Sequence, residues 1–256
     1  MTYIQAIILG VIQGIAEWLP ISSQAMVFLF GRFIFDLGQV EALGISIWLH
    51  TGTLLAALIY FWKDILNIFT LDRKTAIFLI LATIMSGIIA FPLLWFIFLI
   101  ELPEAPFMII IGLLFFIVAF LQKKSREFKL EVEEKELNIR DGLIVGIIQG
   151  FAALPGFSRS GSTVATLLFQ RYSLKEAFRL SFLMSIPIVF LAQIALPIFQ
   201  NEFIVSSELL VGAIVSGLIG FVMIKTLLQL AERVNFFKVT LGLGIVTILL
   251  GIILLF

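Results

Sequence analysis

The chain has 256 residues, of which 61% are hydrophobic and only 13% are charged, and its mean hydropathy is +1.15. Water-soluble domains are roughly half apolar and about a quarter charged, so the composition excludes that class and indicates an integral membrane protein. The 17 basic and 17 acidic residues balance, and the absence of cysteine excludes disulfides, thiolate metal sites and a cysteine nucleophile.

The first apolar stretch, residues 3–35, is too long for one membrane span and breaks at Pro20. Proline removes a backbone donor, and lipid does not satisfy the groups that such a break leaves unpaired. We therefore predict that this stretch is a helical hairpin that enters the protein interior and returns to the same side. Three spans of membrane-crossing length follow, at about 40–62, 75–98 and 104–122.

The second half of the chain repeats this pattern. Residues 141–172 form another long apolar stretch, which breaks around Pro155 and Gly156. Three more spans are predicted, at about 175–199, 207–230 and 236–256. The predicted fold class is thus an all-α integral membrane protein with an inverted-topology repeat, in which six transmembrane helices accompany two re-entrant hairpins that meet near the midplane.

The chain is predicted to be a single membrane domain, residues 1–256. Repeat 1 covers about 1–123, a charged cytoplasmic linker about 124–140, and repeat 2 about 141–256. All Lys and Arg residues except Arg32 and Arg159 fall in the linker or on its side of the membrane, which includes a predicted loop at residues 63–74. By the positive-inside rule that side is cytoplasmic, so both termini face outward and the hairpins enter from opposite sides.

Each hairpin brings polar residues to its break. The first carries Glu17 and the hydroxyl residues Ser22 and Ser23, and the second carries Arg159 among the hydroxyl residues of 158–163. A guanidinium fork matches phosphate oxygens, hydroxyls add donors, and the amides that begin a helix face an anion with the positive end of the helix dipole. The candidates for substrate binding are Gln13, Ser22, Ser158, Ser160, Gly161, Ser162 and Thr163.

A single carboxylate beside phosphate has two natural roles. Glu17 either holds a divalent cation, Mg²⁺ or Ca²⁺, against the phosphates or accepts a proton from the attacking oxygen. A structural alternative stays open, because Glu17 and Arg159 could simply pair with each other. Gln13 could likewise do no more than tie the hairpins together.

The segment Pro155-Gly156-Phe157-Ser158-Arg159-Ser160-Gly161-Ser162-Thr163 resembles the PGxSRSxxT signature of the bacitracin-resistance type of undecaprenyl-pyrophosphate phosphatase. Residues 13–17, Gln-Gly-Ile-Ala-Glu, and residues 19–23, Leu-Pro-Ile-Ser-Ser, are similar to the (E/Q)xxxE and LPxSS motifs of that family. The resemblance implies a membrane hydrolase that removes the terminal phosphate of undecaprenyl, or another polyprenyl, diphosphate. The monophosphate product is the lipid carrier for cell-wall glycan synthesis, and bacitracin resistance is a consequence. The resemblance also implies that Glu17 binds a divalent metal, that Arg159 binds the diphosphate and that Ser23 is the attacking nucleophile.

One position departs from the family pattern. Where the family usually has a histidine, this chain has Met26, which cannot transfer a proton. The only histidine, His50, lies within the predicted span 40–62, where an ionisable residue is costly and points to a site role. We hypothesise that His50 faces the cavity and acts in catalysis with Glu17, Ser23 and Arg159, although a packing role is an equal alternative. The nucleophile is either Ser23 or a metal-activated water.

The expected partners are a polyprenyl diphosphate and membrane lipid, with no nucleic acid, and the sequence leaves monomer and homodimer open. The expected location is the cell (plasma) membrane. Inverted repeats with broken helices are also typical of transporters, so a polyprenyl-phosphate flippase with weak or no phosphatase activity is the alternative function.

Overall fold

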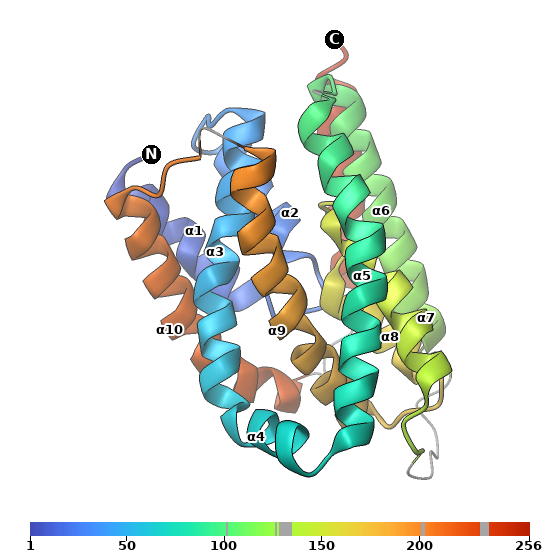
Figure 1. Ribbon diagram of the computed structural model, residues 1–256. Helices are drawn as coiled ribbons and strands as arrows, with labels where there is room; N and C mark the ends of the chain where they lie inside the picture. Colours follow the sequence, from blue (N-terminus) through green and yellow to red (C-terminus); the bar gives the residue numbers. More distant parts are fainter. Residues whose placement is uncertain (101, 126, 128–134, 201–202, 231–235) are drawn as a thin grey trace.

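In the computed structural model, residues 1–100, 102–125, 127, 135–200, 203–230 and 236–256 are described. In these ranges every regular element is a helix, and no strand occurs (Figure 1). Six helices are long and apolar enough to cross a membrane: α3 (Gln39–Tyr60), α5 (Arg73–Leu99), α6 (Glu104–Ser125), α9 (Leu174–Phe199), α10 (Ser207–Leu230) and α11 (Phe236–Ile253). The all-α membrane fold with six spans is therefore confirmed.

The two long apolar stretches are each divided into shorter helices, as predicted. The first consists of α1 (Tyr3–Ala16) and α2 (Ser23–Phe33), separated by residues 17–22, which we call the first break. The second consists of α7 (Ile139–Gly150), a 3₁₀ turn η2 (Phe151–Ala153) and α8 (Arg159–Phe169). We call residues 151–160, which include the first two residues of α8, the second break. The inverted order of the repeats and the membrane side that each stretch enters stay predictions.

Equivalent helices of the two predicted repeats make equivalent contacts. Helix α1 packs on α10, and helix α7 packs on α5. At the first contact Gly10 lies so close to the Gly212 carbonyl that a Cβ atom would overlap it. At the second, a Cβ on Gly146 would come within 2.5 Å of the Ala82 carbonyl oxygen. Small residues thus allow the backbones of both pairs to approach closely, which is how helices commonly associate in lipid.

The predicted loop at residues 63–74 is wrong for most of its length. The structure has a helix there, α4 (Trp62–Thr70), which lies across the end of the bundle between α3 and α5 (Figure 1). Ile68 on this helix is buried while Phe69 is exposed, so only one face of the helix is packed. Because the segment is short and contains charged residues, its sequence resembles that of a loop. In the predicted linker, α6 extends to Ser125 and α7 begins at Ile139, whereas residues 128–134 lie outside the described part.

Two apolar clusters hold the first break and the helix that follows it. Trp18 is buried in one cluster, where its ring meets Phe182 edge to face with the centroids 5.1 Å apart. Phe28 of α2 is buried in the other and meets Phe107 in the same way at 5.4 Å. These contacts fix the residues around the break, where the polar side chains lie.

Candidate active site

The two breaks contact each other directly. The Gly156 amide donates to Ser22 Oγ at 3.1 Å, and Ser160 Oγ donates to the Leu19 carbonyl at 2.9 Å. Gly156 has a φ of +97°, a conformation that disfavours any residue with a side chain. Polar groups that lipid would leave unsatisfied are thus satisfied by the opposite break.

The carbonyl of Pro20 is satisfied from outside the breaks. It accepts hydrogen bonds from Gln122 Nε2 of α6 at 2.5 Å and from Thr240 Oγ1 of α11 at 3.3 Å. Gln122 Oε1 in turn accepts from Thr240 at 3.1 Å. A buried pair of polar side chains on two spanning helices therefore fixes the position of the first break.

Glu17 is the centre of the site. Its side chain is only 5% exposed, and its Oε2 accepts hydrogen bonds from Gln13 Nε2 at 3.0 Å and from Ser23 Oγ at 2.7 Å. Its other oxygen, Oε1, pairs with the Arg159 guanidinium. Burial of a carboxylate is costly unless it is paired and hydrogen-bonded, and both conditions are met here.

Arg159 is held at the first turn of α8. Ser158 caps this helix by accepting from the Gly161 amide at 3.1 Å, and Arg159 Nη1 donates to the Ser181 carbonyl of α9 at 3.1 Å. Its other nitrogen, Nη2, pairs with Glu17. The guanidinium is therefore fixed from two helices and reaches across to the carboxylate of the opposite break.

Ser23 opens α2 directly after a strained residue. Ser22 has a φ of 62° and a ψ of 84°, in the left-handed region that a residue with a side chain rarely adopts. Such strain persists only where the surroundings impose it, and the hydrogen bond from Gly156 to Ser22 is one such constraint. As a result Ser23 Oγ lies within hydrogen-bond reach of both Glu17 and His50.

His50 of α3 lies beside Glu17 and Ser23, and its catalytic role stays a prediction. Its Nε2 lies 3.0 Å from Glu17 Oε2 and 3.3 Å from Ser23 Oγ, and its Nδ1 lies 2.6 Å from the Ser46 carbonyl. Nδ1 faces a carbonyl and Nε2 faces a carboxylate, and both of these groups only accept. Each ring nitrogen of His50 therefore lies within hydrogen-bond distance of a protein oxygen, which fixes the orientation of the ring.

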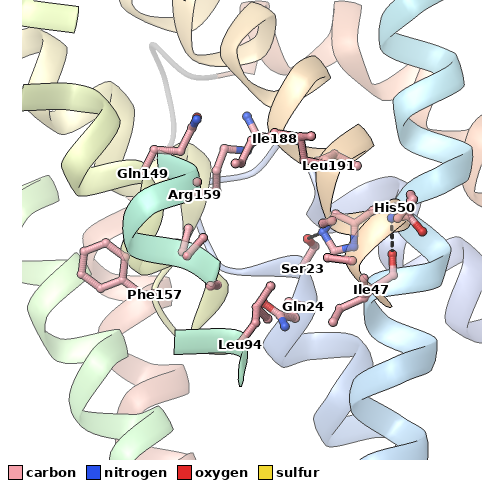
Figure 2. A pocket seen from close by; sticks show the side chains of 18 of the residues that line it. Ser23, Gln24, Ile47, His50, Leu94, Gln149, Phe157, Arg159, Ile188 and Leu191 are labelled. Atoms are coloured by element: carbon pink, nitrogen blue, oxygen red, sulfur yellow. Dashed lines mark hydrogen bonds between the residues drawn. The ribbon is translucent and has the colours of Figure 1, made fainter. Parts of the chain in front are cut away.

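These side chains line a cavity of about 330 Å³. Figure 2 shows Ser23 facing His50 on one side of this cavity, with Arg159 and Gln149 across it. Ligand pockets commonly have volumes of roughly 300–1,000 Å³, so the space suits a small polar group with part of an attached chain. Of the predicted site residues, those that line the cavity are Glu17, Ser22, Ser23, His50, Ser158, Arg159 and Ser160.

The other predicted site residues do not line the cavity. Gln13 lies behind Glu17 and donates to it. The Gly161 amide is taken by Ser158, while Ser162 Oγ and Thr163 Oγ1 both donate to the Arg159 carbonyl, at 3.2 and 2.7 Å. The structure thus places these four residues where they hold Glu17 and the first turn of α8, and their contact with substrate stays a prediction.

Three glutamines that were not among the predicted site residues also line the cavity, namely Gln24, Gln149 and Gln193. Gln149 donates to Ser86 Oγ at 3.0 Å, but its Oε1 is buried without a partner. Gln193 of α9 accepts from Thr51 Oγ1 at 3.0 Å. Gln149 occupies the position in the second repeat that Gln13 occupies in the first, and Gln193 is a polar residue inside an apolar span. Both features are visible in the sequence and could have marked these residues as site candidates.

Few protein groups are available to hold a metal. Among the described residues no group of three His, Cys, Asp or Glu side chains could bind one. Glu17 offers a carboxylate at the cavity, whereas Gln13 Oε1 is buried behind it without a partner. Mg²⁺ is commonly bound through one or two carboxylates plus substrate phosphates and water, so the donors fit a hard divalent cation that substrate helps to bind.

The position of His50 gives a testable prediction. For the phosphate release from a polyprenyl diphosphate that the sequence resemblance implies, we expect His50→Ala to be about 10- to 100-fold slower, because the side chain beside Ser23 and Glu17 is lost. His50→Gln keeps a donor and should lose less. Steady-state kinetics of the purified variants check this, and full activity of His50→Ala would show that the histidine only packs.

Comparison with known proteins agrees with this geometry. The family model described as Bacitracin resistance protein BacA matches residues 6–253. An undecaprenyl-diphosphatase of Methanococcoides burtonii is 38% identical, over 96% of this chain and 97% of the relative. Proteins of the same name from Sulfurisphaera tokodaii and Methanopyrus kandleri are each 33% identical, and cover 99% and 95% of this chain and 98% and 94% of their own lengths.

These matches extend over the whole arrangement of helices, and they confirm the resemblance that rested on the motifs of the two breaks. The model match begins in α1 and ends at the last residue of α11. The chain belongs to the family of the bacitracin resistance protein BacA.

Proposed function

We propose that this protein is an undecaprenyl-diphosphate phosphatase, which hydrolyses the terminal phosphate of a polyprenyl diphosphate and leaves the lipid monophosphate. One observation carries the proposal. The Glu17–Arg159 pair joins the two breaks at the cavity, and a hydroxyl, Ser23 Oγ, lies 2.7 Å from the same carboxylate. Family membership and the names of the relatives support the same reaction.

Substrate binding begins at Arg159. Its guanidinium exchanges Glu17 for oxygens of the diphosphate, and the hydroxyls of Ser158 and Ser160 lie at the same wall of the cavity. The exchange frees Glu17 to act as a base. His50 Nε2 lies beside Ser23 and Glu17 and would help to position the reacting groups, and positioning and charge neutralisation supply most of the catalysis of phosphoryl transfer.

The chemical step then uses Ser23. Its Oγ attacks the terminal phosphorus and its proton passes to Glu17, while the bond from that phosphorus to the bridging oxygen breaks and the lipid monophosphate leaves. Water next attacks the phosphoserine, the Oγ–phosphorus bond breaks, inorganic phosphate leaves and Ser23 regains its proton. A nucleophile, a base within reach and a group that orients the base are the recognisable elements of this chemistry, and here Gln13 orients Glu17.

The substrate-assisted cation site belongs to this proposal. Glu17 lines the cavity and would hold Mg²⁺ or Ca²⁺ with the oxygen that Arg159 releases, while its other oxygen stays beside Ser23 as the base; the cation when bound would add positive charge at the diphosphate. We expect a chelator to lower phosphate release by about 100-fold or more, and added Mg²⁺ or Ca²⁺ to restore it. A rate that does not respond to chelation would show that the reaction needs no divalent metal and that Arg159 provides the needed positive charge.

The cell membrane is the proposed location, with the charged ends of the spans in the cytoplasm and both termini outside. Six apolar helices make the protein multi-pass. A homodimer is a further proposal, which cross-linking in membranes tests. The flippase alternative is not favoured, because the relatives are named for a hydrolytic activity.

The direct test is phosphate release by the purified protein. The protein in detergent, with a polyprenyl diphosphate and Mg²⁺, should release one inorganic phosphate per lipid and leave a lipid monophosphate. A parallel sample in liposomes reports lipid movement. If the protein moves labelled lipid across the bilayer without releasing phosphate, it is a flippase and not a phosphatase.

A further inference from the structure

Two polar side chains outside the cavity hold the middle of the segment that joins Glu17 to Ser23. We propose that Gln122 of α6 and Thr240 of α11 are positioning residues, which set the rate of the chemical step by fixing the Pro20 carbonyl. No described residue of α6 or α11 lines the cavity, so both act without touching substrate. The inference rests on the proposed function, since it assigns these two residues a role in that same reaction.

Pro20 lies midway along the chain between the proposed base and the proposed nucleophile. It is three positions after Glu17 and three before Ser23. Ser23 Oγ donates to Glu17 Oε2 at 2.7 Å, so residues 17–23 form a small loop that this hydrogen bond closes. A fixed point in the middle of so short a loop limits how far its two ends can shift relative to each other.

The same loop contains the strained residue Ser22, whose φ is 62°. Backbone in this region keeps its conformation only where the surrounding structure imposes it. The second break supplies two restraints, because the Gly156 amide donates to Ser22 Oγ and Ser160 Oγ donates to the Leu19 carbonyl. These bonds hold residues 19 and 22, and the carbonyl between them needs a restraint of its own.

Gln122 and Thr240 act on the Pro20 carbonyl as one unit. Gln122 Nε2 donates to this oxygen at 2.5 Å, and Thr240 Oγ1 lies 3.3 Å from the same oxygen and 3.1 Å from Gln122 Oε1. Both side chains are buried, Thr240 completely. Because Thr240 donates to Oε1, the amide of Gln122 presents Nε2 to the carbonyl, so the hydroxyl also fixes the direction of the main donor.

The surroundings of this contact are tightly packed. A Cβ atom at Gly161 of α8 would lie 3.0 Å from Gln122 Nε2 and 3.1 Å from the Pro20 oxygen. Gly161 follows Arg159 by two residues in the first turn of α8. The contact therefore also sets the first break against the helix that carries the guanidinium.

The two positioning residues are carried by a closely packed pair of helices. A Cβ atom at Gly112 of α6 would lie 2.9 Å from the carbonyl oxygen of Gly244 of α11. One at Gly251 of α11 would lie 3.0 Å from the carbonyl oxygen of Ala105 of α6. Such contacts bring backbones close together in lipid, so α6 and α11 present Gln122 and Thr240 to the break from one firm support.

A simpler role for these residues would be to join α6 to α11, because polar side chains often hydrogen-bond across helices in lipid. The bond between Thr240 and Gln122 does join them, but the Pro20 carbonyl belongs to neither helix. Thr247 of α11 provides the contrast, since it is 1% exposed and donates to the Leu243 carbonyl of its own helix at 2.8 Å. It is therefore the matched control for Thr240.

The test separates turnover from binding. We expect Gln122→Met to lower kcat for a polyprenyl diphosphate by about 10- to 100-fold while KM stays within about twofold of wild type, because a small misplacement of reacting groups slows the chemical step. Thr240→Val keeps the amide donor and should lose less, and Thr240→Ser should restore most of that loss. Thr247→Val should keep kcat within about twofold of wild type. Inhibition by inorganic diphosphate should be the same in all variants.

A second readout does not depend on activity. Amide hydrogen exchange in residues 17–23 should be about fivefold or more faster in Gln122→Met than in Thr247→Val, as the loss of about one hydrogen bond implies, and exchange in α5 should be unchanged.

Three results would overturn the inference. They are a kcat for Gln122→Met and Thr240→Val equal to that of Thr247→Val, a rise in KM that matches the fall in kcat, and faster exchange spread through all helices. Failure of wild type and Thr247→Val alike to release phosphate would instead reject the proposed function.

Discussion

Replacement of Arg159 by alanine is expected to lower phosphate release by about a thousandfold or more. Arginines that neutralise a transferring phosphoryl group are worth about 10³–10⁵ in rate, and Arg159 is the one arginine that lines the cavity among the described residues. The measurement is kcat/KM for a polyprenyl diphosphate, with purified protein at saturating Mg²⁺.

The same variant should also be less stable. Removal of Arg159 leaves the carboxylate of Glu17 buried without its guanidinium partner, and breaking a buried pair typically costs about 3–5 kcal/mol. Arg159→Lys keeps the positive charge but loses the two-pronged guanidinium. Relative to Arg159→Ala, it should therefore restore more of the stability than of the activity. Lys175→Ala, at an exposed position beyond α8, is the control that should change neither. Normal turnover by Arg159→Ala would show that the guanidinium takes no part in the reaction.

Ser23→Ala is the second variant for which we expect a loss of about a thousandfold or more. The hydroxyl that lies 2.7 Å from Glu17 is the proposed attacking group, and removal of a nucleophile eliminates the covalent route. Rapid quench with substrate labelled in the terminal phosphate should give labelled wild-type protein and unlabelled Ser23→Ala.

A matched control separates this effect from loss of any buried hydroxyl. Ser185 is buried and donates only to the Phe182 carbonyl, at 2.6 Å, so Ser185→Ala should stay near wild-type activity. If Ser23→Ala turns over within about tenfold of wild type and no label is trapped, water is the nucleophile and Ser23 only orients Glu17.

Much of the fold follows from local properties of the sequence. Spans such as α5 and α9 are long apolar runs whose ends are marked by charged or turn residues, so their bounds were predicted to within a few residues. The breaks were found because Pro20 and Pro155 cannot continue a helix inside lipid. Helix α4 was missed because a short helix with charged residues looks like a loop when neither its packed face nor its surroundings are known.

Part of the candidate site was also predicted, because charged residues are rare in this chain. Charged residues in an apolar chain are few, so Glu17, His50 and Arg159 stand out without any structure. Which hydroxyls face the cavity depends on side-chain direction within one helical turn, and that is why Ser160 lines the cavity whereas Ser162 and Thr163 bond to the backbone of their own helix. The partnerless Gln149 Oε1 and the hydrogen bonds of Gln122 and Thr240 to the Pro20 carbonyl are properties of tertiary packing, which no local pattern encodes.

The central claim is that the two breaks form one phosphate site, in which Glu17 from the first acts together with Arg159 from the second. A double-mutant cycle tests it most directly, with kcat/KM measured for Glu17→Gln, Arg159→Ala and the double variant. The account predicts that each single variant loses about a thousandfold and that the double variant loses little more, because residues that act as a unit are not additive. Losses that multiply in the double variant, or a single variant that keeps wild-type turnover, would contradict it.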